Sequence, residues 1–327
     1  MEPLRIYQEH WGEASSIEVL GEGHINQTWR VTSAAGIRVM QQINKRVFKS
    51  PAVVMENLCH VLNHVKGVPL PRLLLTRHEQ THAVVGGEWY RAWEFVDGGF
   101  AKKSPDTSIE AENVARAFAQ LLEELCSLPN RLALPIPGFH SFDHFHSQYQ
   151  AYRLHSEHDM LLERCQAQSA LLAESTGVIH GDCKFANVLL SPEDSRVLAV
   201  LDLDTAMQGH WGYDWGDLVR SAFVDRTEVD ESMLRALVRG FAGPLGGLDK
   251  SVLLYAPLYV ACTLGVRYLV DHHEGDRWFR VGRHGDNLTR AARQFSFARR
   301  WELQKPKVNE WIDTELQDGG AAGVVSR

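Results

Sequence analysis

The chain has 327 residues, of which 44% are hydrophobic and 23% are charged, and its formal net charge is −7. This composition is ordinary for a globular protein with a sizeable core and leaves room for two lobes. The acidic balance provides no basic surface for nucleic acid or an anionic membrane, so we expect neither partner. Five scattered cysteines without a CxxC pair, and no signal-length apolar run at the N-terminus, predict a reduced, cytoplasmic protein.

The first hundred residues are rich in predicted strands. The expected strands cover 16–20, 28–32, 37–44, 71–76, 81–85 and 88–95, and one helix is expected to begin after Ser50-Pro51. The glycine-containing loop GEGHINQ separates the first two strands. The last strand runs into Asp97-Gly98-Gly99, where we place the boundary between a lobe of residues 1–97 and one of residues 98–327.

Beyond this boundary the apolar residues recur at helical spacing. We expect a helix after Asp106-Thr107-Ser108, and further helices over 145–173, 229–242, 249–272 and 286–303. The segment RVLAVLDLDTA (196–206) interrupts them as the predicted hairpin partner of an earlier loop, and a frayed tail is expected from Gln317 onward. The predicted fold class is α+β, with a small β-rich N-terminal lobe and a larger helical C-terminal lobe.

The earlier loop lies in the sequence VIHGDCKFANVLL (178–190), between two short apolar runs. Asp182, Lys184 and Asn187 follow one another at offsets of zero, two and five residues. A loop held by buried strands at both ends can position such groups rigidly for catalysis. Protein kinases place a base Asp and a metal-binding Asn at the same spacing, whereas a polar β-turn would explain the same residue types without catalysis.

A second acidic motif, LAVLDLDT (198–205), brings Asp202 and Asp204 to the end of an apolar strand. Magnesium prefers hard oxygen ligands, so a carboxylate beside Asn187 would complete a Mg²⁺ site, although two turn carboxylates are the alternative. Asp182 then fits the base that takes the acceptor hydroxyl's proton, and Lys184 the cation on the moving phosphoryl group. The order of the two motifs predicts a two-lobed, protein-kinase-like fold that uses ATP and Mg²⁺.

The combination of HGDCKFANVLL and VLDLDTA resembles the aminoglycoside phosphotransferase and choline kinase family. More of the chain, from about residue 20 to about residue 300, is similar to the N-acetylhexosamine 1-kinases of that group. The similar segments are GEGHINQTWRV, RVMQQINKRVFKSPAVVMENL, GYDWGDLVRSA and the C-terminal block GVRYLVDHHEGDRWFRVGRHGDNLTRAARQF. The resemblance implies an enzyme that phosphorylates a small molecule, with an N-acetylhexosamine as the expected substrate and its anomeric hydroxyl as the acceptor.

The resemblance also implies roles for individual residues. Asp182 would be the catalytic base, Asn187 and Asp202 would bind Mg²⁺, and the GEGHINQT loop would lie over the phosphates of ATP. Substrate contacts are expected from Asp182, His24 and Arg283, with a structural role as the alternative for His24. The residues expected to bind the nucleotide are Gly21, Gly23, Asn26, Thr28, Gln41, Glu94 and Val96.

One position departs from the usual kinase pattern. The third strand reads RVMQQIN, so Gln41 stands where related kinases carry a Lys that pairs with a helix Glu and with the phosphates. Glu56 on the following helix is the expected partner of Gln41, although the two cannot form an ion pair. The uncharged Gln41 motivates a rival hypothesis, a nucleotide-binding pseudokinase that serves as a scaffold. A kinase of an aminoglycoside, choline, homoserine or another amino alcohol is the other alternative.

Two further groups have structural interpretations. Asp214 and Asp217 in GYDWGDLVR are expected to brace the catalytic loop, because an Asp at a helix start can accept N–H bonds from a nearby loop. The cluster FHSFDHFHSQY contains His140, Asp143, His144 and His146 and suggests zinc, but its spacing matches no closed zinc site and no cysteine joins it.

Overall fold

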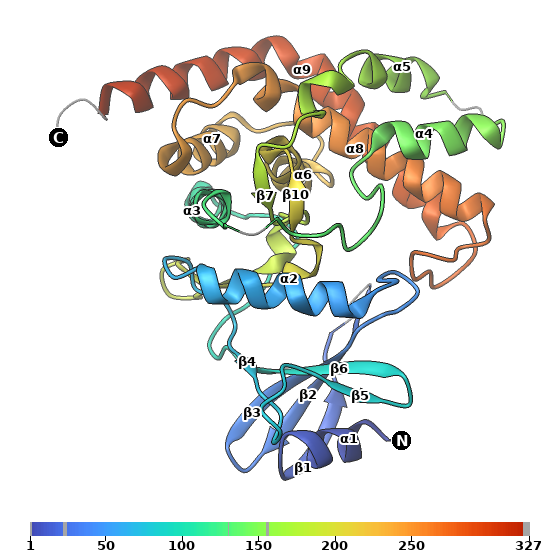
Figure 1. Ribbon diagram of the computed structural model, residues 1–327. Helices are drawn as coiled ribbons and strands as arrows, with labels where there is room; N and C mark the ends of the chain where they lie inside the picture. Colours follow the sequence, from blue (N-terminus) through green and yellow to red (C-terminus); the bar gives the residue numbers. More distant parts are fainter. Residues whose placement is uncertain (1, 22–24, 130, 155–156, 323–327) are drawn as a thin grey trace.

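The computed structural model describes residues 2–21, 25–129, 131–154 and 157–322, with side chains described up to Gln317. A small antiparallel sheet lies at one end of the molecule and a larger helical part at the other (Figure 1). This arrangement confirms the predicted α+β, two-lobed fold class.

The N-terminal sheet has the strand order β1-β2-β3-β6-β4, and β5 pairs with β6. Its strands are β1 (Ala14–Val19), β2 (Gln27–Ser33), β3 (Gly36–Gln42), β4 (Leu73–Leu74), β5 (Ala83–Val85) and β6 (Glu88–Glu94). The register opposes Met40 to both Trp29 and Ala92, and these side chains form one small core with Ile6 and Tyr7. Ile6 and Tyr7 belong to α1 (Pro3–His10), a helix that the sequence analysis did not predict.

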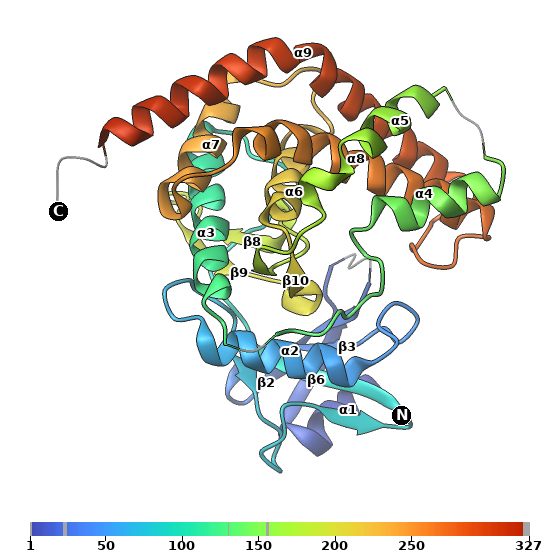
Figure 2. The ribbon, with the colours of Figure 1, turned by 45° about the horizontal axis from the view of Figure 1, so that its top comes forward.

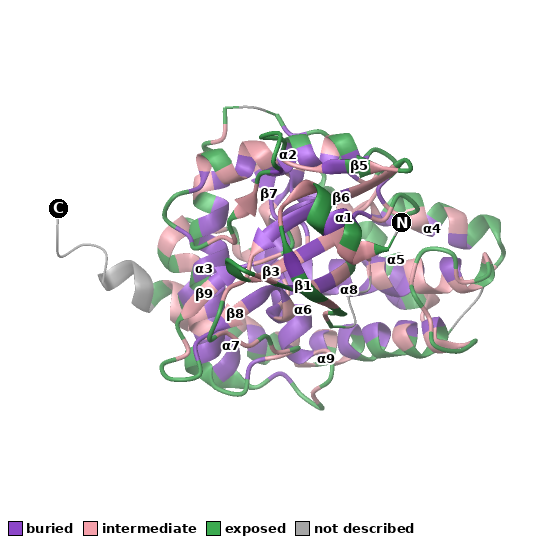
Figure 3. Ribbon diagram, turned by 90° about the horizontal axis from the view of Figure 1, so that it is seen from below, coloured by how far each residue is buried: buried purple, intermediate pink, exposed green. Residues whose placement is uncertain are grey.

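Burial differs between the two layers of this lobe. Figure 3 shows exposed residues on the outer side of α1, whereas β6 is buried along its middle. The predicted strand 71–76 is reduced to the two residues of β4 because the chain turns at Thr76, whose N–H donates to the carbonyl of Gln80. The sheet is therefore shorter at this edge than expected.

Helix α2 (Pro51–His64) lies between the sheet and the helical lobe (Figure 2). Its buried residues Val54, Leu58 and Val61 belong to the large core of the helical lobe rather than to the small core beneath the sheet. Asn57, on the same face, donates through Nδ2 to the carbonyls of Ala133 and Ala206, at 2.8 and 3.1 Å. These bonds satisfy a buried amide and tie α2 to the chain beside the candidate active site.

The helical lobe contains α3 (Ser108–Cys126), α4 (Phe142–Ala151), α5 (Asp159–Ala167), α6 (Trp211–Phe223), α7 (Glu231–Leu245), α8 (Lys250–His273) and α9 (Asp286–Ala322). The prediction of one helix over 145–173 is wrong, since Arg153 adopts a positive φ of 52° just after α4 and turns the chain. The predicted tail from Gln317 is also wrong up to Ala322, because α9 continues that far. Its buried Val308 and Ile312 join the core, and Glu315 pairs with Arg239 on α7.

The first turns of α3 and α6 are capped by different residue types. Thr107 caps α3, and its side chain accepts a hydrogen bond from the Glu110 N–H at 3.2 Å. The cap of α6 is His210, whose side chain accepts a hydrogen bond from the Gly212 N–H, so neither Asp214 nor Asp217 caps that helix.

Helix α8 is long and apolar enough to cross a membrane by length and composition, but 72% of its most apolar window is buried within the protein. Pro257 in this helix has no N–H, which frees the carbonyl of Leu253. The indole of Trp215 on α6 donates to that carbonyl at 2.9 Å. In this structure α8 is thus packed as a core helix.

Four short strands surround the loop that the sequence singles out. Strand β7 (Gly177–Ile179) pairs with β10 (Met207–Gly209), and β8 (Val188–Leu190) pairs with β9 (Val197–Val200). The second pair confirms that segment 196–206 is the hairpin partner of this loop. Both pairs are antiparallel and largely buried, so they hold the loop at its two ends.

Candidate active site

The loop between β7 and β8 is anchored by the buried ring of Phe185 and by one close backbone approach. Gly181 has a φ of +82°, and a Cβ at this position would lie 2.6 Å from the carbonyl oxygen of Thr205. Only glycine tolerates both constraints, which explains the Gly between His180 and Asp182.

Asp214, in the first turn of α6, braces this loop. Its two carboxylate oxygens accept the backbone N–H groups of His180 at 2.9 Å and Gly181 at 2.8 Å. Burial raises the pKa of this carboxyl although these donors oppose the effect. The expected bracing role is confirmed for Asp214, whereas Asp217 pairs instead with the Arg220 guanidinium at 2.7 Å.

The imidazole of His180 connects the loop to the strand that carries the second motif. Its Nδ1 accepts the Asp182 backbone N–H at 3.2 Å, and its Nε2 lies 3.0 Å from the Leu201 carbonyl oxygen. The two contacts are satisfied together by the neutral tautomer with its proton on Nε2. A hydrogen bond from the Leu201 N–H to the Asn187 carbonyl, at 2.8 Å, makes a second connection.

The structure brings Asp182, Lys184 and Asn187 into direct contact. Asp182 Oδ2 accepts hydrogen bonds from Lys184 Nζ at 2.6 Å and from Asn187 Nδ2 at 2.9 Å. Burial raises the pKa of Asp182, but the Lys184 ammonium and its hydrogen bond oppose this, and the net pKa is lower than usual. The carboxylate is therefore ionised near neutral pH. Among the described residues its Oδ1 has no hydrogen-bond donor, so this oxygen can accept a proton.

Asp202 follows β9 with left-handed backbone angles of φ 61° and ψ 59°. Its side chain reaches solvent, yet the surrounding protein displaces water from the carboxylate, and Asp204 and Asp182 add like charge. Together these effects raise the pKa of Asp202 to about 6. A divalent cation would relieve this repulsion, and Asn187 offers its Oδ1 because its Nδ2 is used by Asp182. Asp202 and Asn187 could therefore hold a metal ion together.

Arg91 on β6 extends from the sheet into the helical lobe. Its guanidinium is 1% exposed and forms a two-armed ion pair with Asp204, with Nη1–Oδ1 at 2.6 Å and Nη2–Oδ2 at 2.8 Å. Its Nε donates to Gln41 Oε1 at 3.0 Å, and the same oxygen accepts from the Trp93 indole at 2.8 Å. Gln41 Nε2 donates in turn to Thr28 Oγ1 at 3.4 Å. Arg91 is therefore the buried cation on the sheet side of the candidate active site.

These contacts correct the expectation that Glu56 is the partner of Gln41. Glu56 is exposed on α2, while the Gln41 amide holds the Arg91 guanidinium in place. Sequence reasoning missed Arg91 because EWYRAWEF reads as a strand in which one Arg faces solvent. Arg91 lies directly opposite Gln41 in the sheet, and this register, which no local sequence pattern reveals, brings the two side chains together.

The glycine-containing loop is only partly described. Gly21 has a positive φ of 69°, whereas Gly23 and His24 lie outside the described residues, so their expected roles remain predictions. Asn26 Nδ2 donates to Asp204 Oδ2 at 2.7 Å, and its Oδ1 accepts the Asn44 N–H at 3.0 Å. Asn26 thus joins the Arg91–Asp204 network.

The expected nucleotide residues Glu94 and Val96 lie where the sheet leads into the helical lobe. Glu94 N–H donates to the Arg72 carbonyl at 2.9 Å, and its carboxylate pairs with the Arg72 guanidinium at 3.2 Å. Beyond Val96, Phe100 forms two backbone hydrogen bonds with Leu190 of β8, at 3.0 and 2.9 Å. The connection between the lobes is therefore fastened to the strand that follows the catalytic loop.

Arg283, the expected sugar contact, lies in the turn before α9. Its side chain is 86% exposed, and its Nε lies 3.3 Å from Asp286 Oδ1. Within the described part of the chain, no hydrogen bond or ion pair links Arg283 to Asp182.

Arg267 on α8 is a cation that the sequence analysis did not single out. Burial lowers its pKa, against the influence of acidic groups that include Asp182. Its guanidinium carbon lies 4.5 Å from the ring centroid of Phe139 and 5.2 Å from that of Phe145. His140 Nε2 lies 2.9 Å from the Gly181 carbonyl oxygen, and burial together with Arg267 lowers the pKa of His140 to about 3. A neutral imidazole and a guanidinium thus lie close to the catalytic loop.

Comparison with known proteins agrees with this geometry. A model of the phosphotransferase enzyme family matches residues 16–249, which is more than half of the chain. A solved aminoglycoside phosphotransferase from Alicyclobacillus acidocaldarius is similar in fold, with a TM-score of 0.68 and 16% identity over 96% of this chain and 97% of that one. A choline/ethanolamine kinase family protein from Mesorhizobium loti gives a TM-score of 0.62 and 15% identity, with 93% of each chain covered.

An amicoumacin kinase, solved with AMP-PNP, Ca²⁺ and its ligand, gives a TM-score of 0.64 and 10% identity over 94% of this chain and 91% of that one. Identities this low establish a shared fold alone, and the family is shown by the match to residues 16–249. The chain belongs to the phosphotransferase enzyme family and is a phosphotransferase that acts on a hydroxyl group.

Proposed function

We propose that this protein uses ATP and Mg²⁺ to phosphorylate the anomeric hydroxyl of an N-acetylhexosamine, giving the sugar 1-phosphate. In this proposal residues 1–97 form the nucleotide lobe and residues 98–327 the catalytic and substrate lobe. The observation that carries it is the Asp182 carboxylate. Lys184 and Asn187 hold one of its oxygens, and the other has no hydrogen-bond donor among the described residues and can meet an acceptor hydroxyl.

Asp182 is the proposed base. Because Lys184 keeps its pKa low, Asp182 orients the acceptor hydroxyl and takes its proton late, as the bond to phosphorus forms. The Lys184 ammonium has its own pKa raised, since burial is outweighed by Asp182 and Asp202, and so it stays charged beside the transferred group. These two residues supply the proton acceptor and a positive charge within 2.6 Å of each other.

Asn187 and Asp202 are the proposed Mg²⁺ ligands. Bound Mg²⁺ neutralises phosphate charge in such reactions. The raised pKa of Asp202 supports this role, because a carboxylate crowded by Asp204 and Asp182 gains most from a nearby divalent cation. Arg91 and Gln41 are expected to position Asp204 and the sheet. The loop from Gly21 to Thr28 is expected to contact the phosphates of ATP.

The cation near the catalytic loop favours a neutral acceptor. Arg267 would repel a polycationic aminoglycoside, whereas its fork of N–H donors suits sugar hydroxyls or an acetamide carbonyl. The rings of Phe139 and Phe145 beside it offer apolar surface for a sugar face or an acetyl methyl group. We therefore propose Arg267, in place of Arg283, as the guanidinium that donates hydrogen bonds to the sugar. His24 remains a second proposed sugar contact.

A coupled ADP-release assay with Mg²⁺ and ATP tests the proposal. The acceptors are free N-acetylhexosamines, plain hexoses, choline, homoserine and kanamycin. We expect turnover with an N-acetylhexosamine and a product that has lost its reducing end. Preference for kanamycin or choline would contradict the sugar proposal, and ADP release with none of the acceptors would favour the scaffold.

A further inference from the structure

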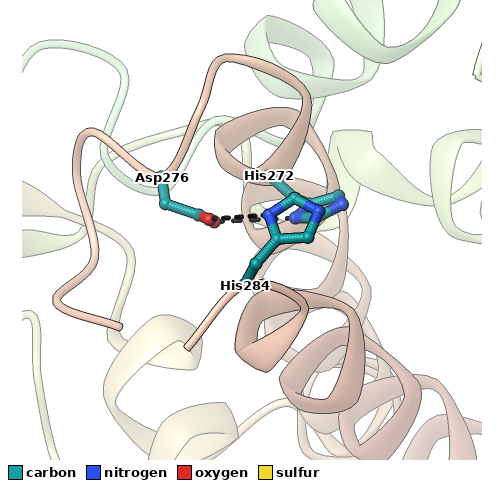
Figure 4. Close-up of side chains that lie close together, drawn as sticks. All are labelled: His272, Asp276 and His284. Atoms are coloured by element: carbon teal, nitrogen blue, oxygen red, sulfur yellow. Dashed lines mark ion pairs between the residues drawn. The ribbon is translucent and has the colours of Figure 1, made fainter. Parts of the chain in front are cut away.

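A cluster of two histidines and an aspartate lies at the far end of α8, outside the proposed catalytic residues (Figure 4). His272 is in the last turn of α8, Asp276 follows the helix, and His284 precedes α9. The three side chains can each offer one ligand atom, and these atoms lie within 4.8 Å of one another.

The contacts within this cluster are too long for hydrogen bonds. His272 Nδ1 lies 3.6 Å from Asp276 Oδ1, and His284 Nδ1 lies 3.8 Å from Asp276 Oδ2. His272 Nδ1 is buried and has no hydrogen-bond partner among the described residues, which is unusual for a buried polar atom. The three side chains point toward one another at ion-pair distance, without a hydrogen bond between the histidines and Asp276 (Figure 4).

These separations suit a shared metal ion. Ligand atoms about 2.0–2.1 Å from a tetrahedral zinc ion lie about 3.3 Å from each other. The two histidines face different oxygens of Asp276, at 3.6 and 3.8 Å, and the three ligand atoms lie within 4.8 Å of one another, so a bound ion would draw these side chains closer together. Imidazole nitrogens with one carboxylate are typical ligands of Zn²⁺ and of neighbouring transition metals. A bound ion would also give the buried Nδ1 of His272 its missing partner.

The residues around the cluster hold it in shape. Asn287 is buried, and its Nδ2 donates to Asp276 Oδ1 at 2.8 Å and to Asp271 Oδ2 at 2.9 Å. Asp271 also accepts the backbone N–H groups of Arg277 and Trp278, both at 2.8 Å. Second-layer bonds of this kind orient ligands and support metal affinity.

We propose that His272, Asp276 and His284 form a transition-metal site that takes Zn²⁺, with water in the fourth position. The ion joins the end of α8 to the start of α9 and closes the loop of residues 275–285. This loop presents Trp278, whose ring centroid lies 5.2 Å from the ammonium nitrogen of Lys49 ahead of α2. The proposed ion therefore has a structural role, because it stabilises a loop that contacts the N-terminal lobe.

Metal binding by the full, tag-free chain tests this proposal. After chelation and dialysis, equilibrium dialysis with Zn²⁺ is measured in excess Mg²⁺, which occupies the carboxylates of the catalytic loop. We expect one Zn²⁺ per chain, and visible d–d bands of tetrahedral Co²⁺ when that ion replaces zinc.

The variants separate this site from chance binding by other histidines. His284→Ala removes an exposed side chain and is expected to fold normally but to lower zinc affinity by at least about tenfold. Asp276→Asn keeps a residue that tolerates the positive φ of 57° and should also weaken binding. The matched control is His273→Ala, which removes the neighbouring exposed imidazole and should leave affinity unchanged.

Trypsin gives an independent readout, because the loop contains Arg277, Arg280 and Arg283, all exposed. Zinc should slow cleavage there in the wild type and in His273→Ala, but not in His284→Ala. Failure to bind zinc in excess Mg²⁺, or equal zinc affinity in His284→Ala and wild type, would overturn the proposal.

Discussion

The candidate active site has a helical wall, formed by the loop of Asp182, and a sheet wall, formed by Arg91 and Gln41. The contacting residues are close together in the sequence in the first wall and far apart in the second. On the helical side, Asp182 contacts Lys184 and Asn187, which are two and five residues away. On the sheet side, Arg91 reaches Asp204 across 113 residues of sequence, and Gln41 reaches Arg91 across 50. The first wall is a local motif, whereas the second exists only when both lobes are folded and in contact.

This difference predicts different consequences of mutation. The local wall is carried by buried short strands, so changing its polar groups should alter turnover while the fold remains. The long-range wall contains a desolvated ion pair between the lobes, so its variants should first lose stability.

Apart from loss of the catalytic base, the largest effect on turnover is expected from Asp202→Ala. Removing a proposed metal ligand should lower kcat by about 10³-fold, which corresponds to several kcal/mol of transition-state stabilisation. The measurement is ADP release over a Mg²⁺ titration, with thermal unfolding as the check on folding. Wild-type kcat in this variant would remove Asp202 from the site.

Arg91→Ala should cause the largest loss of stability, because it leaves the buried Asp204 carboxylate without its cation. Breaking a buried pair in this way costs about 3–5 kcal/mol, measured by urea unfolding. The exposed pair Arg30–Glu18 supplies the control, and Arg30→Ala should change stability by less than about 1 kcal/mol. Equal losses of unfolding free energy in both variants would mean that the buried Arg91–Asp204 pair stabilises the protein no more than an exposed pair does.

Lys184→Ala should lower kcat by about 10²-fold, as expected when one charged contact to the transition state is lost. It should also change the pH profile. Lys184 is the main group that lowers the pKa of Asp182, so its removal raises that pKa and moves the acid limb of kcat/KM to higher pH. An unmoved acid limb would show that Asp182 does not control the profile.

Gln41→Lys should have the smallest effect on chemistry. The Gln41 carbonyl oxygen accepts from both Arg91 and Trp93, and a lysine can accept from neither. We expect a loss of about 1–3 kcal/mol in unfolding free energy and no tighter binding of ATP. A clear gain in ATP affinity, measured by calorimetry, would instead show that this strand touches phosphate.

The helical wall could be predicted from sequence because its chemistry is local. The spacing of Asp182, Lys184 and Asn187 placed all three on one loop, and the apolar runs around them predicted the strands that hold it. The bracing role of Asp214 was also predicted, since an Asp at a helix start can accept N–H bonds from a nearby loop.

The sheet wall could not be predicted in the same way. That Arg91 is buried depends on the register of β3 with β6 and on how the sheet meets Asp204, and neither is encoded in a local pattern. For the same reason, the interruption between α4 and α5 and the extension of α9 were missed. Arg153 turns the chain at a positive φ, and α9 continues because Val308 and Ile312 find a core to enter.

The central claim is that Asp182 acts as a base and not only as part of the loop's structure. Asp182→Asn keeps the shape of the side chain, and its amide oxygen, placed where Oδ2 lies, can still accept hydrogen bonds from Lys184 and Asn187. The test compares ADP release by this variant and by wild type with the preferred acceptor. Calorimetry on the same preparations measures the binding of Mg²⁺–nucleotide. The account predicts nucleotide affinity within a few-fold of wild type and a loss of kcat of about 10²–10⁴-fold. Turnover close to wild type, with nucleotide still bound, would contradict it.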